Sequence, residues 1–203
     1  MRQISRRDLV GAMITGATTG GAVWGIFSYL GIILPFGIHG AYLLIFIPIL
    51  WIFGVQLGYS LGLFWPAMEQ FGRYCAVGFT NASVDFGILY ICIAVTGVAS
   101  GILFAVFKTL SYIIAVSHSY FWNKQWAFYN GNAHESVGQL KRFIFVNIAA
   151  MVVNVVTSSI VIMLRVPNID IQRWAGISAI VGSAVALIFS FIGFRRFVFR
   201  ARL

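Results

Sequence analysis

The chain has 203 residues, of which 60% are hydrophobic and only 9% are charged. Soluble domains carry roughly a quarter charged residues, so this composition excludes an ordinary water-soluble protein. The formal net charge is +9, but no loop is long enough to fold into a basic surface, and nucleic acid is therefore not an expected partner. Basic segments that contact anionic lipid heads at a membrane account for the charge.

Apolar stretches of about 20 residues predict helices that cross a membrane, because the hydrocarbon layer is roughly 30 Å thick. Each span must satisfy its backbone hydrogen bonds internally, and the chain lacks the polar–apolar alternation of barrel strands. The sequence therefore predicts an all-α membrane protein with six transmembrane helices, at about residues 10–34, 41–65, 74–97, 102–123, 143–164 and 174–194.

The first two spans are rich in small residues at four-residue spacing, with Gly16 and Gly20 in one and Gly54, Gly58 and Gly62 in the other. Such faces let helix backbones approach closely in lipid. Two explanations stay open: the two helices pack on each other within one chain, or the glycines form a homodimer interface. The first span is too long for the apolar part of a secretory signal, and we retain it as a helix.

The last four spans contain an internal repeat. Residues 119–128, at the end of the fourth span, match residues 190–199, at the end of the sixth: both begin with Ser and carry a basic residue before a closing Phe. Arg73, before the third span, likewise aligns with Arg142, before the fifth. Each copy has two spans, so both enter the membrane in the same direction, as tandem parallel repeats related by an axis along the membrane normal.

The repeat divides the chain into an additional N-terminal two-helix hairpin at residues 1–66 and a four-helix domain at residues 67–203. Basic residues predict the orientation, because they gather on the cytoplasmic side. With cytoplasmic termini, only Arg165 and Arg173 lie outside. The cytoplasmic set is then Arg2, Arg6, Arg7, Arg73, Lys124, Lys141, Arg142, Arg195, Arg196, Arg200 and Arg202. We expect a flexible cytoplasmic connector at about residues 123–142.

Four motifs occur in order through the last four spans. They are Phe71-x-Arg73-Tyr74-x-x-Val77-Gly78-x-x-Asn81-x-x-x-Asp85, Lys108-x-x-Ser111-Tyr112, Ser119-x-x-x-Asn123-Lys124-x-Trp126-x-Phe128 and Phe194-Arg195-Arg196-Phe197-Val198-Phe199. On these motifs, residues 70–200 resemble the GtrA-like family of small four-span membrane proteins. The resemblance implies translocation of polyprenyl-phosphate-linked sugars across the cytoplasmic membrane, which supplies donors for surface polysaccharides. The match departs in two places: the first two helices are additional, and Phe194 stands where the first copy has Asn123.

Two charged side chains lie at membrane depth. Asp85 lies roughly 18 Å along a helix from Arg73, and Lys108 lies roughly 24 Å from Lys124. An ionisable group at such depth costs at least roughly 2.5–3.5 kcal/mol, so each side chain needs a partner. Two interpretations stay open. Asp85 and Lys108 form a structural ion pair, or Lys108 contacts the lipid phosphate while Asp85 tunes it or binds sugar hydroxyls.

Further polar residues extend this candidate substrate-binding site. One set is a polar stripe, which either lines a path for a sugar head group or only joins the helices by hydrogen bonds. It comprises Asn81, Asp85, Ser111, Tyr112, Asn147 and Asn154. A second set consists of basic residues at the cytoplasmic rim, which either bind a phosphate or diphosphate group or only set the topology. It comprises Arg73, Lys124, Arg142, Arg195 and Arg196. The resemblance adds Asn123 to the binding residues.

Enzymatic chemistry, a metal and a cofactor are not expected. The acidic residues are few and none are close in sequence: Asp8, Glu69, Asp85, Glu135 and Asp170. Acid–base or metal-assisted sugar transfer therefore lacks the groups it needs. The sequence predicts a flippase for polyprenyl-phosphate sugars in the cytoplasmic membrane, surrounded by membrane lipids. The alternative is a non-transporting partner that anchors or positions a membrane glycosyltransferase.

Overall fold

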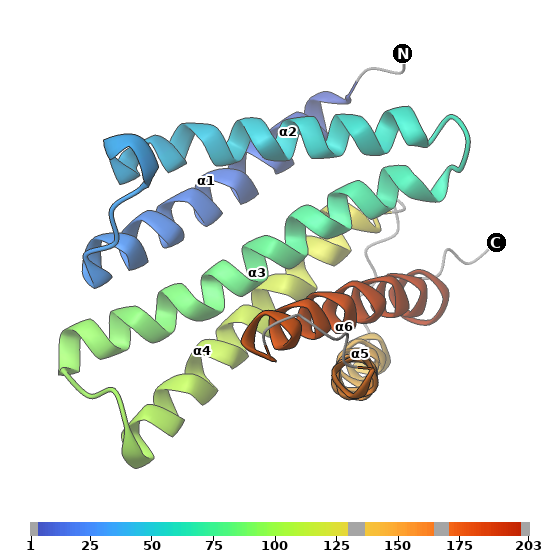
Figure 1. Ribbon diagram of the computed structural model, residues 1–203. Helices are drawn as coiled ribbons and strands as arrows, with labels where there is room; N and C mark the ends of the chain where they lie inside the picture. The colour runs from blue at the N-terminus through green and yellow to red at the C-terminus, as the bar shows by residue number, and fades with distance from the viewer. Residues whose placement is uncertain (1–3, 130–136, 165–170, 200–203) are drawn as a thin grey trace. The chain divides into compact units, whose positions relative to one another are not determined.

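The computed structural model describes residues 4–129, 137–164 and 171–199, and within these ranges the chain is helical with no strand. Six helices are long and apolar enough to span a membrane, which confirms the predicted all-α class. They are α1 (Arg6–Leu30), α2 (Leu43–Leu61), α3 (Ala67–Thr96), α4 (Gly101–Trp122), α5 (Val137–Met163) and α6 (Ile171–Gly193) (Figure 1). The orientation of the termini stays a prediction.

Local sequence signals define several helix ends. Ser5 caps α1, because its side-chain oxygen accepts a hydrogen bond from the backbone N–H of Asp8 at 3.1 Å. Helices α1 and α3 end at Gly31 and Gly97, with φ of 66° and 70°, in the left-handed region that favours glycine. Between α1 and α2 the chain forms two short 3₁₀ turns rather than an open loop.

The expected connector at residues 123–142 is wrong over much of its length. Helix α4 continues directly into a π-helical turn, η3 (Asn123–Ala127), and α5 already begins at Val137. The centre of the expected connector, residues 130–136, lies outside the described residues. The apolar and aromatic side chains of residues 126–128 are buried, and this burial keeps the segment ordered as helix rather than loop.

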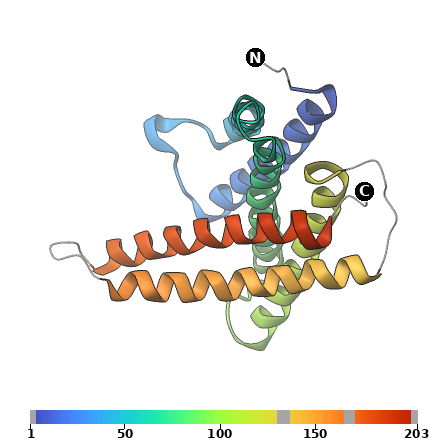
Figure 2. The same cartoon turned by 90° about the vertical axis from the view of Figure 1, so that its right-hand side faces the viewer.

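The helices form two compact units, Met1–Tyr129 and Asn130–Leu203. In the first unit α1 packs along both α2 and α3, and α3 also packs along α2 and α4. In the second unit α5 and α6 lie side by side and antiparallel (Figure 2). The division into a hairpin at residues 1–66 and a four-helix domain at residues 67–203 stays a prediction.

Glycines permit the close packing of α1 on α2. A Cβ added to Gly16 would lie 2.5 Å from Pro48 Cα, and one added to Gly20 would lie 2.4 Å from the carbonyl oxygen of Leu43. These separations leave no room for a side chain, so packing within one chain accounts for both glycines. Gly58 instead approaches α3, where an added Cβ would lie 2.8 Å from the Met68 carbonyl oxygen. A homodimer through this region stays a prediction.

The two ends that the repeat aligns adopt the same local conformation. Helix α6 runs into a second π-helical turn, η4 (Phe194–Val198), at the register of η3. Each turn closes with a hydrogen bond of 2.8 Å, from the Phe128 N–H to the Asn123 carbonyl and from the Phe199 N–H to the Phe194 carbonyl. The matched sequences therefore specify matched backbones. How the two copies are related in space stays a prediction.

Equivalent aromatic pairs also occur in the two units. The rings of Tyr74 and Phe128 lie 5.8 Å apart, and the equivalent rings of Phe143 and Phe199 lie 6.3 Å apart. In the second unit Phe194 adds a third ring, stacked on Phe143 at 4.7 Å. The first copy has Asn123 at the position of Phe194. The second copy therefore has a third aromatic ring where the first copy has an amide side chain.

Candidate functional site

Asp85 of α3 and Lys108 of α4 form an ion pair, as the sequence predicted. Lys108 Nζ lies 2.5 Å from Asp85 Oδ2, and the hydroxyl of Ser111 donates a hydrogen bond of 2.6 Å to Asp85 Oδ1. Ser111 lies about one helical turn beyond Lys108, so α4 presents both groups to the same carboxylate. Each oxygen of Asp85 therefore has a partner, which offsets the cost of a carboxylate at membrane depth.

The two charges of this pair differ in exposure. The side chain of Asp85 is 17% exposed, whereas that of Lys108 is 41% exposed. Lys108 Nζ also lies 5.4 Å from the centre of the Phe86 ring, within the range of a cation–π interaction. The ammonium group is thus held by Asp85 on one side and remains accessible on another. This geometry fits a cation that can bind an anionic ligand without leaving its carboxylate unpaired, because Ser111 stays on Asp85.

The second copy has the same juxtaposition without the ion pair. Under the alignment of the copies, Asp85 is equivalent to Asn154 and Ser111 to Gly182, while the position of Lys108 holds an alanine. A Cβ on Gly182 would lie 2.8 Å from Asn154 Oδ1, so these equivalent positions also face each other. Any chemistry that needs the charged pair belongs to the first copy.

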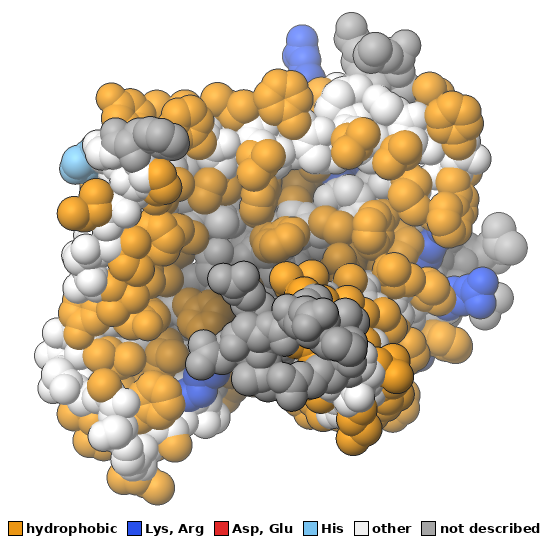
Figure 3. All heavy atoms as spheres, viewed as in Figure 1, with side chains coloured by type: hydrophobic (Ala, Val, Ile, Leu, Met, Phe, Trp, Pro, Cys, Tyr) orange, Lys and Arg blue, Asp and Glu red, His pale blue; other side chains and the backbone are white. Residues whose placement is uncertain are grey.

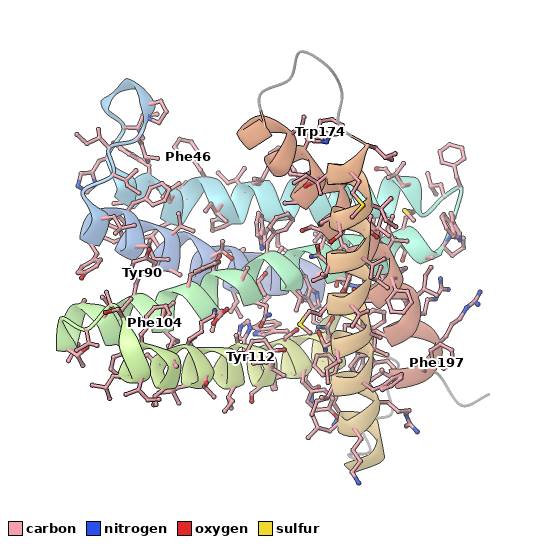
Figure 4. All side chains as sticks on the ribbon, turned by 60° about the horizontal axis from the view of Figure 1, so that its bottom comes forward. Phe46, Tyr90, Phe104, Tyr112, Trp174 and Phe197 are labelled. Carbon is pink, nitrogen blue, oxygen red and sulfur yellow. The ribbon has the colours of Figure 1, made fainter. Side chains whose placement is uncertain are left out.

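The remaining stripe residues do not all join the pair. Asn81 Oδ1 is buried and has no hydrogen-bond partner among the described residues. Tyr112 lies on α4 with its side chain 52% exposed, in contrast to the fully buried Ser111 beside it (Figure 4). In the second unit Asn147 donates back to the carbonyl of Phe143 in its own helix. A continuous polar path through all six residues stays a prediction.

The predicted basic rim is divided between the two units. In the first unit Lys124 is buried, with its Nζ 5.9 Å from the centre of the Tyr120 ring. The Asn123 side chain donates to the Ser119 carbonyl at 2.8 Å, and its own Oδ1 is buried with no hydrogen-bond partner among the described residues. In the second unit the exposed members are Arg142, Arg195 and Arg196. Their assembly into one phosphate site stays a prediction.

Arg73, the remaining rim residue, is engaged by a buried carboxylate that was not among the predicted site residues. Asp8 is only 4% exposed. Its oxygens accept hydrogen bonds from the Ser5 hydroxyl at 2.7 Å, from the Trp126 indole N–H at 2.8 Å and from the Tyr59 hydroxyl. One terminal nitrogen of Arg73 lies 3.3 Å from both oxygens. We call these five residues the Asp8 cluster.

The Asp8 cluster joins elements that are remote in sequence. Tyr59 comes from α2, Arg73 from α3 and Trp126 from η3, and each contacts the first turn of α1. Gly11 makes room for the indole, because an added Cβ would lie 2.4 Å from a Trp126 ring atom. Ser5 and Asp8 have the spacing of a capping box, and this local signal identifies the helix start but not the distant partners.

Six helices long and apolar enough to span a membrane define a multi-pass membrane protein. The chain belongs to the GtrA/DPMS transmembrane domain family, whose model matches residues 73–199. The match begins at Arg73, ends at Phe199 and leaves out α1 and α2, so it confirms the family that the motifs resembled. Membership connects the chain with membrane-embedded functions related to sugar-carrying lipids.

The chain is also similar to a curated protein, the uncharacterized membrane protein YngA of Bacillus subtilis (strain 168). The two are 29% identical over 83 residues, which cover 41% of this chain and 52% of YngA. The aligned region thus spans about half the length of that relative. No solved structure matches the chain.

Proposed function

We propose that the protein translocates polyprenyl-phosphate-linked sugars across the cytoplasmic membrane, without catalysis of its own. The observation that carries this proposal is the Lys108 ammonium group. It lies at membrane depth, is bound to Asp85 and is still 41% exposed. A phosphate that crosses the hydrocarbon layer needs a compensating charge at that depth, since an uncompensated ion costs several kcal/mol there.

The contacts of the pair account for how such a site would work. Lys108 contacts the lipid phosphate as the headgroup passes, and the flexible stem of lysine lets its charge follow the anion. Asp85 keeps the Ser111 hydroxyl as a donor at 2.6 Å when the ammonium group turns toward the phosphate. The exchange therefore leaves neither the carboxylate nor the ammonium group without a partner, which lowers the barrier to passage.

The test is a flipping assay in proteoliposomes with a defined polyprenyl-phosphate sugar. Lys108→Met and Asp85→Leu singly leave one unpaired ion at membrane depth, so each should destabilise the protein. The double variant removes both charges, and it should fold and reach the membrane but lose translocation. Thr109→Met, which adds the same side chain one residue beyond the site, serves as the control and should translocate normally.

A stable double variant that flips lipid at the wild-type rate would eliminate the assignment of both residues. The alternative role of an anchoring partner would be favoured if the protein binds both the lipid and a membrane glycosyltransferase but flips no lipid at any lipid concentration. A co-purification experiment with the glycosyltransferase separates that alternative from simple inactivity of the reconstituted protein.

A further inference from the structure

Two apolar cavities lie along α3 in the first unit. The larger, about 660 Å³, is lined by α2 and α3, and its residues include Leu50, Trp51, Leu57, Phe71, Cys75 and Phe79. The smaller, about 380 Å³, is lined by α1, α2 and α3, and its residues include Thr19, Val23, Trp51, Phe79, Phe86 and Tyr90. The face formed by α2 and α3 is covered by hydrophobic side chains (Figure 3).

Glycines give the larger cavity a floor of backbone. Gly54, Gly58 and Gly72 all line it, and a Cβ on Gly72 would lie 3.3 Å from the Gly54 carbonyl oxygen. Large side chains such as Leu57 and Phe71 line the same cavity. The larger cavity therefore combines exposed backbone at the glycines with bulky apolar side chains, a lining that suits an apolar chain.

The two cavities are neighbours that share two lining residues. Trp51 and Phe79 line both, with their ring centres 5.8 Å apart, and Trp51 is oriented by a hydrogen bond of 3.3 Å from its indole N–H to the Thr80 hydroxyl. We refer to the two neighbouring cavities together as the hydrocarbon track. From Phe71 to Phe86 the track runs roughly 22 Å along α3, most of the roughly 30 Å hydrocarbon layer.

The track leads to the ion pair. Phe86 lines the smaller cavity, and its ring centre lies 5.4 Å from Lys108 Nζ. A phosphate bound to Lys108 therefore has an apolar path beside it. We propose that the hydrocarbon track binds the polyprenyl chain of a lipid phosphate whose headgroup contacts Lys108. This inference rests on the proposed function and adds the site that recognises the long isoprenoid chain.

A matched pair of variants tests the track. Gly54 lines the larger cavity, and Gly25 lines neither cavity, yet an added Cβ meets no atom within 4 Å at either position. Gly54→Leu therefore fills the track without disturbing helix packing, and Gly25→Leu is the control. Binding is measured in nanodiscs with a long polyprenyl phosphate and with a two-isoprene phosphate that is too short to fill the track.

Gly54→Leu should weaken the long ligand about tenfold, because overpacking a filled site is costly. The short ligand should be unaffected, and Gly25→Leu should bind both normally. The double variant Asp85→Leu/Lys108→Met, which leaves no unpaired ion, should weaken both ligands, since each carries the phosphate. In a Cys92→Ala background, the long ligand should also slow alkylation of Cys75, which lines the larger cavity, and the short ligand should not.

Equal binding of the long ligand by Gly54→Leu and Gly25→Leu would overturn the inference. Equal protection of Cys75 by a two-chain phospholipid would also overturn it. A third contrary result would be a dimer that Gly54→Leu dissociates while lipid binding is unchanged, because the larger cavity would then be a subunit interface. The proposed function and the chain site can fail independently. Binding in the track without any flipping would reject translocation and retain the chain site. Normal flipping by Gly54→Leu with unaltered lipid binding would reject the chain site and retain translocation.

Discussion

Replacing Asp8 by alanine should strongly destabilise the protein. The change removes the acceptor for the Ser5, Tyr59 and Trp126 donors. It also leaves Arg73 without its carboxylate, and the Arg73 side chain is largely buried, at 15% exposed. Breaking a buried ion pair costs about 3–5 kcal/mol. Because Arg73 keeps some access to solvent, we expect the lower end, about 3 kcal/mol.

The assay is thermal unfolding of the purified protein in detergent. A loss of about 3 kcal/mol corresponds to a fall in apparent Tm of roughly 6–12 °C for a chain of this size. Asp8→Asn keeps an oxygen acceptor and should lose less. The double variant Asp8→Ala/Arg73→Leu removes both charges and should recover the part of the loss that arises from the unpaired arginine, whereas the Tyr59 and Trp126 donors remain without their acceptor.

Two results would refute this account. If Asp8→Ala/Arg73→Leu is no more stable than Asp8→Ala, the loss does not arise from an uncompensated arginine. If Asp8→Ala unfolds within 1–2 °C of the wild type, about what 0.5 kcal/mol would produce, the cluster is exposed to solvent in the membrane-embedded protein.

Three further predictions follow from the packing and the charge pattern. A cysteine at Asn132, which lies outside the described residues, should resist an impermeant maleimide added to intact cells, because the basic residues place it inside; labelling from outside would contradict the orientation. Gly16→Leu should lower the Tm, since its Cβ meets the α2 backbone, and Gly25→Leu should not; equal effects would contradict the packing. Trp126→Phe removes one donor to Asp8 and should cost about 1 kcal/mol, with no further loss when Asp8 is already alanine.

Much of the fold could be predicted from the sequence because its signals are local. Apolar length alone locates all six helices, although α3 begins at Ala67 and α5 at Val137, earlier than hydropathy indicates. Polar and amphipathic residues continue a helix into the interface, where water solvates them and the cost of burying them in hydrocarbon is absent. The π-helical turns were not predictable in this way, because such turns are rare and apolar length does not distinguish them from the α-helix that they continue.

The candidate site was predictable only where a charged side chain lies deep in the hydrocarbon layer and therefore needs a partner of opposite charge. Asp85 and Lys108 are charged side chains within apolar spans at similar height, so an ion pair was one of the two interpretations that the sequence left open. Asp8 gave no such signal, because it stands in the first turn of α1 beside Arg6 and Arg7, where a carboxylate is ordinarily exposed. Its partner Arg73 is 65 positions away in the sequence, and a single sequence carries no record of such a contact.

The additional hairpin is best understood through these long-range contacts. It lies outside the region that matches the family model, yet it supplies the carboxylate for Arg73, the first matched residue. It also supplies Trp51, Gly54 and Gly58 to the lining of the proposed hydrocarbon track. A chain reduced to residues 67–203 would therefore lose the neutralising partner of a largely buried arginine and one wall of the track at once. The hairpin is consequently packed against α3 and tied to it by the Asp8–Arg73 ion pair, and is not joined to it through the chain alone.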